Sequence, residues 1–400
     1  MDSLDYLQEK LIHLQEKYSH RPRYCAWRMA FISLRALTKR FDGKVDSLSR
    51  CWGKQRDYPA IVFSVKGGMG DLLLANNYIY CVRKYLNDAN FNFKICYHAL
   101  PLLQAFCFPE AETGTKLDKM SGVLKVELNR FPRVLAGDRK KLSQYSPRLG
   151  HLLVTWDNFF KHNRKFFDFM PQTDGLGNHY TQLLGAKRIS QADIGGVLNM
   201  DEEYKAPIPM PSSGKERDIL TKFGLNGDPF VTVQRGQGLV TNTSTNNKLW
   251  PVEYYNTLVG LIKHQGPRYK IVQLGTSREG FNEDFEGVDF NLRGKTNLEE
   301  IKVILKYSKL HIDCEGGLVH LRHALHAGPS VVLFGPTSPE VYGYKENLNL
   351  HSSACKHPCE WVTNDWLSRC ARRKDKNCCM KKLEPQFVFE QINKRFALKK

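Results

Sequence analysis

The segment Gly67–Asp71 has the composition of a loop that binds an anion beside a proton acceptor. Its glycines let the backbone approach a ligand closely, and the first amides of a following helix would donate to an anion. Asp71, near the predicted helix start, is favoured as a carboxylate by the helix dipole and could take a proton from a hydroxyl group. Because Asp is also a common capping residue, a purely structural role is the alternative.

Lys248 lies directly before a predicted helix that begins near Pro251 and Val252. Proline suits the first helical turn, where its missing amide costs nothing. An ammonium group beside the exposed amides of a helix start is suited to a diphosphate. A solvated surface lysine explains the residue equally well.

The segment Glu315–His320 again joins a predicted strand to a predicted helix. Free amides at Gly317 and Leu318 could hold phosphate oxygens, and Glu315 could accept from ligand hydroxyls. His320, one turn into the helix, is either a ligand contact or a core histidine with its hydrogen bonds satisfied.

Five of the eleven cysteines lie between Cys355 and Cys379. Four thiolates from Cys355, Cys359, Cys370 and Cys379 could close tetrahedrally around structural zinc or iron, with Cys378 as an alternative to its neighbour. Free thiols are the other interpretation. The many Arg and Lys residues around the cluster favour an anionic acceptor or membrane contact, or form a solvated loop.

Alternating apolar runs and amphipathic stretches predict the elements that position these residues. A strand over 60–65, a helix over 72–86 and a strand over 93–97 form a βαβ unit, which predicts a parallel sheet. After a proline-rich linker over 205–214 the alternation restarts, with strands over 230–234, 270–274, 311–313 and 330–334 and helices over 252–263, 298–307 and 318–325. All the motifs follow strands, where ligands gather in open α/β sheets, so one site between two halves is predicted.

The composition is that of a globular protein, with 42% hydrophobic and 25% charged residues in 400. It excludes long disorder, collagen-like repeats and a bundle of membrane spans. The net charge of +18 predicts an anionic partner. Acidic and polar residues punctuate Met1 to Ser19, so we expect no secretory signal, reduced thiols and a cytoplasmic location, peripheral at the inner membrane if residues 1–58 dock there.

Five motifs, in order and spacing, resemble those of glycosyltransferase family 9, the bacterial heptosyltransferases. They are Met69-Gly70-Asp71, Lys248-Leu249-Trp250-Pro251, Arg293–Leu298, Gly317–His320 and Phe334-Gly335-Pro336-Thr337, within a resemblance from Pro59 to Val388. The resemblance implies an α/β GT-B fold, with two Rossmann-like domains facing a cleft. We expect an N-terminal helical extension over 1–58, an acceptor-binding domain over 59–205 and a nucleotide-sugar-binding domain over 206–400, which contains the cysteine-rich segment 355–379.

The resemblance also implies an activity and its residues. The activity is inverting transfer of heptose, or a related sugar, from an ADP-sugar to a hydroxyl of a lipopolysaccharide-type acceptor, with no cofactor for catalysis. Asp71 matches the general base, and the substrate-binding residues are Gly70, Lys248, Glu315, Gly317, Leu318 and His320. Glu315 stands where the family usually has Asp, and Asp313 lies two residues earlier, so either could contact the sugar.

The cysteine-rich segment is similar to that of autotransporter heptosyltransferases, which bind iron and glycosylate proteins. This similarity implies an alternative function, a protein O-heptosyltransferase that acts on an autotransporter or other surface protein. A binder of anionic surfaces or nucleic acid without activity is a third class, but no zinc-finger, helix-turn-helix or RNP pattern supports it. The expected partners are therefore an ADP-sugar, an anionic glycolipid or protein acceptor, the inner-membrane surface and further copies of the chain, but no nucleic acid.

Overall fold

The computed structural model describes the main elements of the unit Tyr58–Lys400. The described residues are 60–65, 68–86, 92–97, 112–113, 124–128, 132–162, 193–201, 203–236, 246–265, 269–277, 283–355, 358–360, 365–370, 372 and 377–396. The predicted N-terminal helical extension over 1–58 and Gly67 lie outside them.

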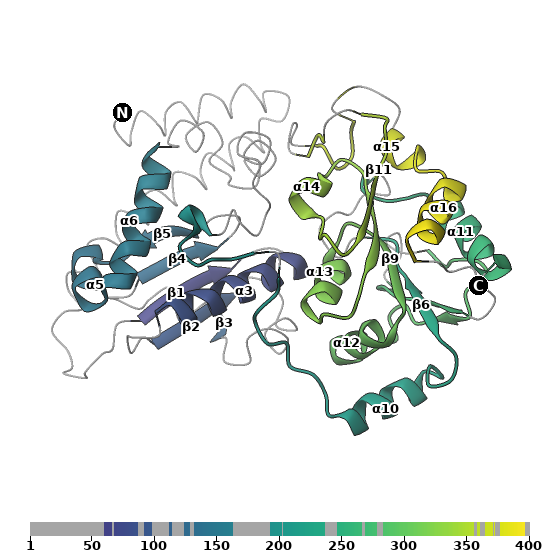
Figure 1. Cartoon of the computed structure of the whole chain (residues 1–400), viewed down its shortest axis with the longest axis horizontal. Helices are drawn as coiled ribbons and strands as arrows, with labels where there is room; N and C mark the ends of the chain where they lie inside the picture. Colours follow the sequence, from purple (N-terminus) through teal and green to yellow (C-terminus); the bar gives the residue numbers. More distant parts are fainter. Residues whose placement is uncertain are drawn as a thin grey trace, which may run out of the picture. The chain divides into compact units, whose positions relative to one another are not determined.

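The first sheet has five strands in the order β3-β2-β1-β4-β5 (Figure 1). Its strands are β1 (Ala60–Val65), β2 (Asn92–Tyr97), β3 (Glu112–Thr113), β4 (Leu124–Leu128) and β5 (Pro132–Ala136). The central strand β1 pairs in parallel with β2 and β4, and β5 is antiparallel to β4. The predicted parallel βαβ unit is therefore confirmed, with α3 (Met69–Tyr85) as its helix.

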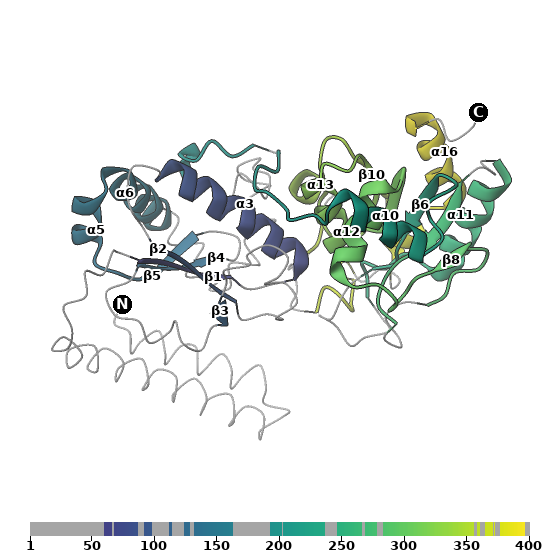
Figure 2. The same ribbon diagram turned by 90° about the horizontal axis from the view of Figure 1, so that it is seen from below.

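Strand β1 is a continuous apolar run from Ala60 to Phe63, and its alternate residues face one side of the sheet. Ile61, Phe63 and Val65 belong to one buried cluster, together with residues of α3 and of α6 (Pro147–His162). Figure 2 shows α3 and α6 on the same face of the sheet. A shorter helix, α5 (Arg139–Tyr145), precedes α6 and packs against it.

The second sheet has six parallel strands in the order β11-β10-β9-β6-β7-β8. They are β6 (Phe230–Val233), β7 (Lys270–Gln273), β8 (Phe290–Asn291), β9 (Leu310–Cys314), β10 (Ser330–Phe334) and β11 (Leu348–His351). In chain order this arrangement is 3-2-1-4-5-6, the strand order of a Rossmann fold.

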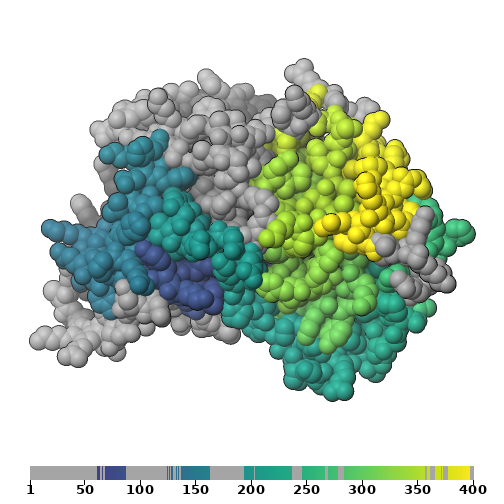
Figure 3. Space-filling model, viewed as in Figure 1, coloured from purple at the N-terminus to yellow at the C-terminus, as the bar shows by residue number. Residues whose placement is uncertain are grey.

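Helices cover both faces of the second sheet, which explains why its strands are apolar on both sides. Val231 and Ile271 pack with α11 (Val252–Gln265) and α16 (Pro385–Phe396), whereas Val272 and Val332 pack with the opposite layer. That layer contains α12 (Leu298–Tyr307) and α13 (Gly317–Ala324). Figure 3 shows the C-terminal residues, in yellow, packed directly against the segment around β11.

Most predicted elements are confirmed within one or two residues, and α12 and β10 have the predicted bounds. Helix α3 begins at Met69, earlier than the predicted start at Leu72. The patterns did not predict β4, β5, β11, α5, α6 or α16, nor the short elements η5 (Ile194–Gly196), α14 (Pro339–Tyr342) and α15 (Cys378–Lys381).

The predicted linker over 205–214 is confirmed as far as residue 212, whereas Ser213 and Gly214 begin α10 (Ser213–Lys222), a helix that the patterns did not predict. The linker is attached to α3, because the Asn77 side-chain oxygen accepts from the backbone amides of Lys205 and Ala206 at 2.8 and 3.1 Å. Tyr204 forms hydrogen bonds through its side chain and its backbone. Its hydroxyl accepts from the Asn76 side chain at 2.7 Å, and its carbonyl oxygen lies 2.9 Å from Nε2 of His326, a residue just after α13.

Candidate active site

In both sheets the strand order reverses beside the first strand of the sheet. The candidate residues follow the strands that flank these reversal points. In the first sheet β1 lies between β2 and β4, and Gly68–Asp71 follows β1. In the second sheet β6 lies beside β9, and Gly236 and Glu315–Gly317 follow these two strands. Ligands of open α/β sheets bind beyond the carboxyl ends of the strands at such points.

Asp71 caps the start of α3. Its Oδ2 accepts a hydrogen bond of 2.8 Å from the backbone amide of Gly68, and Leu72 donates to the Gly68 carbonyl at 3.1 Å. The structural interpretation of Asp71 is therefore correct. It does not compete with a chemical role, because the same position at the positive end of the helix favours the carboxylate form.

The first turns of α3 and α13 lie against each other. A Cβ atom added at Gly70 would lie 2.5 Å from Cδ2 of His320, and one at Gly317 would lie 2.9 Å from the Met69 Cβ. Only glycine permits such close approach at either position. The contact brings the amide-rich start of one α/β half, with Asp71, next to the corresponding loop of the other.

Lys248 and Glu315 form an ion pair in this region, with side chains that are only 11% and 8% exposed. Burial raises the pKa of Glu315, but the Lys248 ammonium and the His320 hydrogen bond lower it more, so the carboxyl pKa lies well below its ordinary value. Lys248 was predicted to meet a diphosphate and Glu315 a sugar hydroxyl. Here the two residues, 67 positions apart in sequence, hold each other.

His320 connects the ion pair to α3. Its Nε2 lies 3.6 Å from Oε1 of Glu315, and its Nδ1 is in hydrogen-bond contact with the Tyr344 hydroxyl at 2.6 Å. His323 stacks on Tyr344 with ring centroids 3.5 Å apart and contacts Glu346 at 2.5 Å. The interpretation of His320 as a buried, hydrogen-bonded histidine is therefore confirmed, and its contact with a ligand stays a prediction.

Asp313 and His311 lie beneath the site on β9 and are completely buried. Asp313 Oδ1 accepts from the Gly236 amide at 3.1 Å, which joins the loops after β6 and β9. Burial raises the pKa of Asp313, whereas burial and the charge of Arg322 lower the pKa of His311 to about 3. Asp313 was an alternative to Glu315 as the sugar contact, but its burial favours Glu315.

The structure thus brings together Gly70, Lys248, Glu315, Gly317 and His320, with Asp71 adjacent to Gly70 in the chain. Leu318 differs, because its side chain is 5% exposed and packs in the apolar core, so only its backbone amide faces the helix start. Tyr344 is a neighbour of the site that the sequence patterns did not indicate, because it lies on a loop without a recognisable motif.

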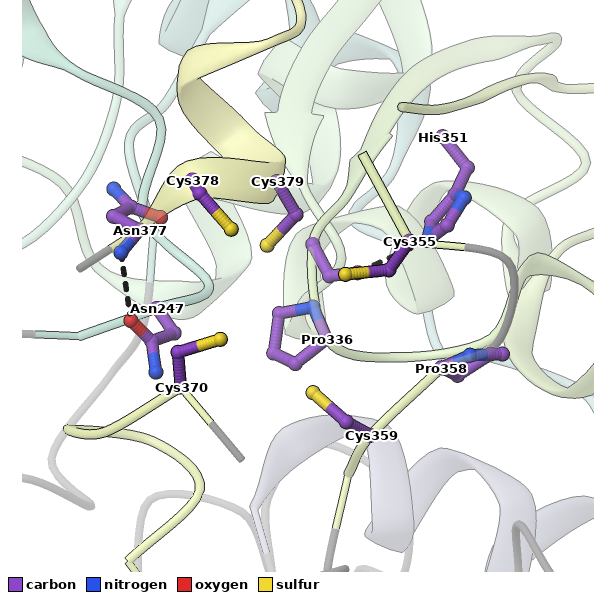
Figure 4. A pocket seen from close by; sticks show the side chains of 11 residues that line it. Asn247, Pro336, His351, Cys355, Pro358, Cys359, Cys370, Asn377, Cys378 and Cys379 are labelled. Atoms are coloured by element: carbon purple, nitrogen blue, oxygen red, sulfur yellow. Dashed lines mark hydrogen bonds between the residues drawn. The ribbon is translucent and has the colours of Figure 1, made fainter. Parts of the chain in front are cut away.

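The five C-terminal cysteines line one pocket with an empty volume of about 350 Å³ (Figure 4). They come from the loop after β11, the segment around Cys370 and the start of α15. Asn247, Gly335, Pro336, His351, Pro358 and Asn377 complete the lining. Burial and the neighbouring thiols raise the pKa of Cys379 to about 12.

The pocket fits a soft metal ion in donor type but is not a preformed metal site. Thiolates are the ligands that zinc and iron prefer, and several thiols converge here. Among the described side chains, however, no three His, Cys, Asp or Glu residues are arranged to hold a metal ion. A bound metal would therefore require the thiols to move closer together.

Residues 208–367 match the family model described as "Glycosyltransferase family 9 (heptosyltransferase)". Lipopolysaccharide heptosyltransferase 1 of Salmonella typhimurium is 30% identical over 125 residues, which are 30% of this chain and 38% of that protein. The chain thus spans less than half the length of the curated relatives it matches.

Two solved structures share the fold. A glycosyl transferase family 9 protein from Veillonella parvula has a TM-score of 0.53 at 14% identity, covering 86% of this chain and 99% of that one. The iron-containing dodecameric glycosyltransferase TibC from enterotoxigenic Escherichia coli has a TM-score of 0.51 at 15% identity, covering 86% and 80%. TibC has also been solved with ADP-D-β-D-heptose. The predicted GT-B fold is confirmed.

Among the helices that the structure describes, none is long and apolar enough to cross a membrane.

Proposed function

We propose that the protein is an inverting glycosyltransferase that transfers heptose, or a related sugar, from an ADP-sugar to a hydroxyl of a lipopolysaccharide-type acceptor. Residues 59–205 would bind the acceptor and residues 206–400 the nucleotide sugar. The family match over residues 208–367 and the GT-B fold support the reaction class.

The contact between α3 and α13 carries this proposal. It packs Gly70, the residue before Asp71, against His320 and packs Met69 against Gly317, and His320 in turn lies 3.6 Å from Glu315, the ion-pair partner of Lys248. A sugar transfer between two substrates needs this combination, since one group must accept a proton from the acceptor while others neutralise the departing diphosphate.

In the proposed reaction Asp71 takes the proton of the acceptor hydroxyl. The acceptor oxygen then bonds to the anomeric carbon as the bond from that carbon to the diphosphate oxygen breaks, and attack from the opposite face inverts the configuration. Lys248 and the amides of Gly317 and Leu318 stabilise the charge on the departing ADP. Glu315 would release Lys248 to the diphosphate and accept from a sugar hydroxyl.

The proposal is tested by mixing the purified protein with ADP-heptose and a heptose-deficient lipopolysaccharide core, and measuring ADP release and the product mass. ADP alone should raise the melting temperature, because it binds only the folded protein. If ADP causes no shift and no acceptor gains a sugar, the transferase function is wrong. A response to oligonucleotides that disappears with added salt would instead indicate a nucleic-acid binder.

A protein acceptor is the second candidate, and the cysteine pocket favours it. The pocket gathers the five cysteines of the segment for which a similarity to autotransporter heptosyltransferases is predicted, and TibC, which shares the fold, is iron-containing. In this proposal Cys355, Cys359, Cys370 and Cys379 hold a structural iron or zinc. Mass spectrometry of surface proteins and lipopolysaccharide from a deletion strain distinguishes the acceptors, because only one class should lose a sugar.

A further inference from the structure

Hydrogen bonds of Asn247 connect the cysteine-rich segment to the loop on which Lys248 lies. The Asn247 backbone amide donates to the Leu367 carbonyl at 2.6 Å, and its side-chain nitrogen donates to the Trp366 carbonyl at 2.8 Å. Its side-chain oxygen accepts from the Asn377 amide at 3.1 Å. Asn247 is only 4% exposed, so these three bonds satisfy polar groups that water does not reach.

A second attachment comes from Asn377, which directly precedes Cys378 and Cys379. Its side-chain nitrogen donates to the Leu249 carbonyl at 2.7 Å, one residue beyond Lys248. Asn377 has a left-handed backbone (φ 60°), a conformation that Asn tolerates better than most residues. Asn247 and Asn377 therefore hold the backbone on both sides of Lys248, and Figure 4 shows the two side chains together at one wall of the pocket.

The loop after β10 provides a third contact with the loop that carries Lys248. Pro336 accepts from the backbone amides of Cys359 and Glu360 at 2.9 and 3.0 Å, which ties the second cysteine to this loop. A Cβ added at Gly335 would lie 2.7 Å from the Asn247 carbonyl oxygen, so the two backbones are in close contact. The Lys248 loop therefore lies close against the loop after β10, at a position where a side chain would not fit.

Lys248 itself bonds to other residues. Its backbone amide donates to the Asn246 side chain at 2.9 Å, while its ammonium group reaches Glu315 at the candidate active site. Lys248, the proposed diphosphate contact, thus directly follows Asn247 in the wall of the cysteine pocket. The position of the ammonium depends on bonds that the cysteine-rich segment supplies.

We propose that Asn247 is a positioning residue that couples the cysteine-lined pocket to Lys248 and thereby sets the affinity for a nucleoside diphosphate. This inference rests on the proposed function, in which Lys248 contacts the diphosphate. It assigns the cysteine-rich segment a role in the active site. Because coupling free energies are reciprocal, a pocket ligand that changes the affinity for a diphosphate would itself bind with an affinity changed by the same factor when the diphosphate is present.

The test is a double-mutant cycle with ADP as the ligand, measured by titration calorimetry on the full chain. N247A should weaken ADP binding about tenfold, and K248M should weaken it at least as much. In the K248M background N247A should change ADP affinity less than twofold, because the group that it positions is gone. A merely structural role would instead give equal losses in both backgrounds.

Asn347→Ala is the matched control. Asn347 is 8% exposed and its side chain accepts from the Ser330 amide at 2.8 Å, at the opposite end of β10 from Gly335. N347A should lower the melting temperature, as N247A does, but leave ADP affinity within twofold. If N247A does not fold, N377G serves, since glycine keeps the left-handed backbone and removes only the bond to Leu249.

The outcomes separate the inference from the proposed function. If the wild-type protein does not bind ADP, both are wrong. If it binds ADP but N247A and N377G bind it equally well, or if N247A acts equally in the K248M background, only the coupling through Asn247 is wrong.

Discussion

Lys248 and Glu315 form an ion pair that is almost completely withdrawn from water, with side chains 11% and 8% exposed. Glu315 lies at the carboxyl end of β9, and Lys248 lies on the loop before α11. A diphosphate that binds Lys248 must compete with this carboxylate. The pair therefore holds the lysine in place.

Removing Lys248 should destabilise the protein more than removing both charges. K248M leaves the Glu315 carboxylate buried without its main partner, which costs about 3–5 kcal/mol of unfolding free energy. The double variant K248M/E315Q should recover most of this loss in urea denaturation, although its ADP affinity should stay low. A loss below about 1 kcal/mol for K248M would show that the lysine does not compensate the buried charge.

Substitutions of Asp71 should separate its capping role from its chemical role. D71N keeps an oxygen that accepts from the Gly68 amide, so its stability should match the wild type within about 0.5 kcal/mol. It cannot take a proton, so turnover should fall about 10²–10⁴-fold with ADP affinity unchanged. D71A should additionally lose about 1 kcal/mol of stability, because the cap is gone. Near-normal turnover by D71N would exclude Asp71 as the base.

Gly70 should not tolerate a methyl group. Ala at this position would place Cβ 2.5 Å from His320, so G70A should displace the histidine, lower stability and reduce turnover. Gly214 is the matched control, since it is likewise the second residue of its helix, α10, and has no atoms within 4 Å of an added Cβ. G214A should be neutral or stabilising by up to about 1 kcal/mol, because Ala is the better helix former. Equal effects of the two changes would contradict the contact.

His311 should make stability depend on pH below neutrality. Its pKa is lowered from 6.5 to about 3 in the folded protein, so the unfolded chain binds one more proton between these values. The contribution of His311 to the unfolding free energy is complete above about pH 6.5. It is lost as the pH falls, by up to about 1.4 kcal/mol per pH unit. H311N cannot take up this proton, so its unfolding free energy should fall less steeply between pH 6 and pH 4.5, about the range accessible to denaturation. Parallel slopes for both proteins would show that His311 is not held neutral.

The cysteine pocket should bind one metal ion for each chain if its thiols form a structural site. Elemental analysis of the purified protein should find about one zinc or iron, and C379S should lose it together with stability. Cys81, a buried cysteine on α3 outside the pocket, provides the control C81S, which should keep the metal. A folded, active preparation without metal would remove the structural-metal proposal.

The sequence by itself determined the local elements and their order. The elements β1, β10 and α12 could be predicted because each shows one clear pattern. In β1 and β10 it is a continuous run of branched apolar residues, and in α12 it is an amphipathic stripe. The sequence also determined that glycine-rich turns follow β1 and β9, which places them at the carboxyl edges of parallel strands.

Two kinds of element escaped these patterns. The strand β9 was predicted over 311–313 and extends one residue further at each end, to Leu310 and Cys314, since its pairing with β6 and β10 sets its length. The antiparallel strand β5 carries a proline at its start and has no strong alternation. In both cases long-range pairing outweighs the local residue preferences.

Only the tertiary structure decided which side chains meet. Lys248 with Glu315, Gly70 with His320 and Asn247 with Asn377 are far apart in the chain, and no local pattern specifies such pairs. Their contacts follow from sheet order and helix packing, which bring the loops at the carboxyl ends of β1, β6 and β9 near one another. The sequence thus named most of the candidate residues, whereas burial and packing determined their partners and their charges.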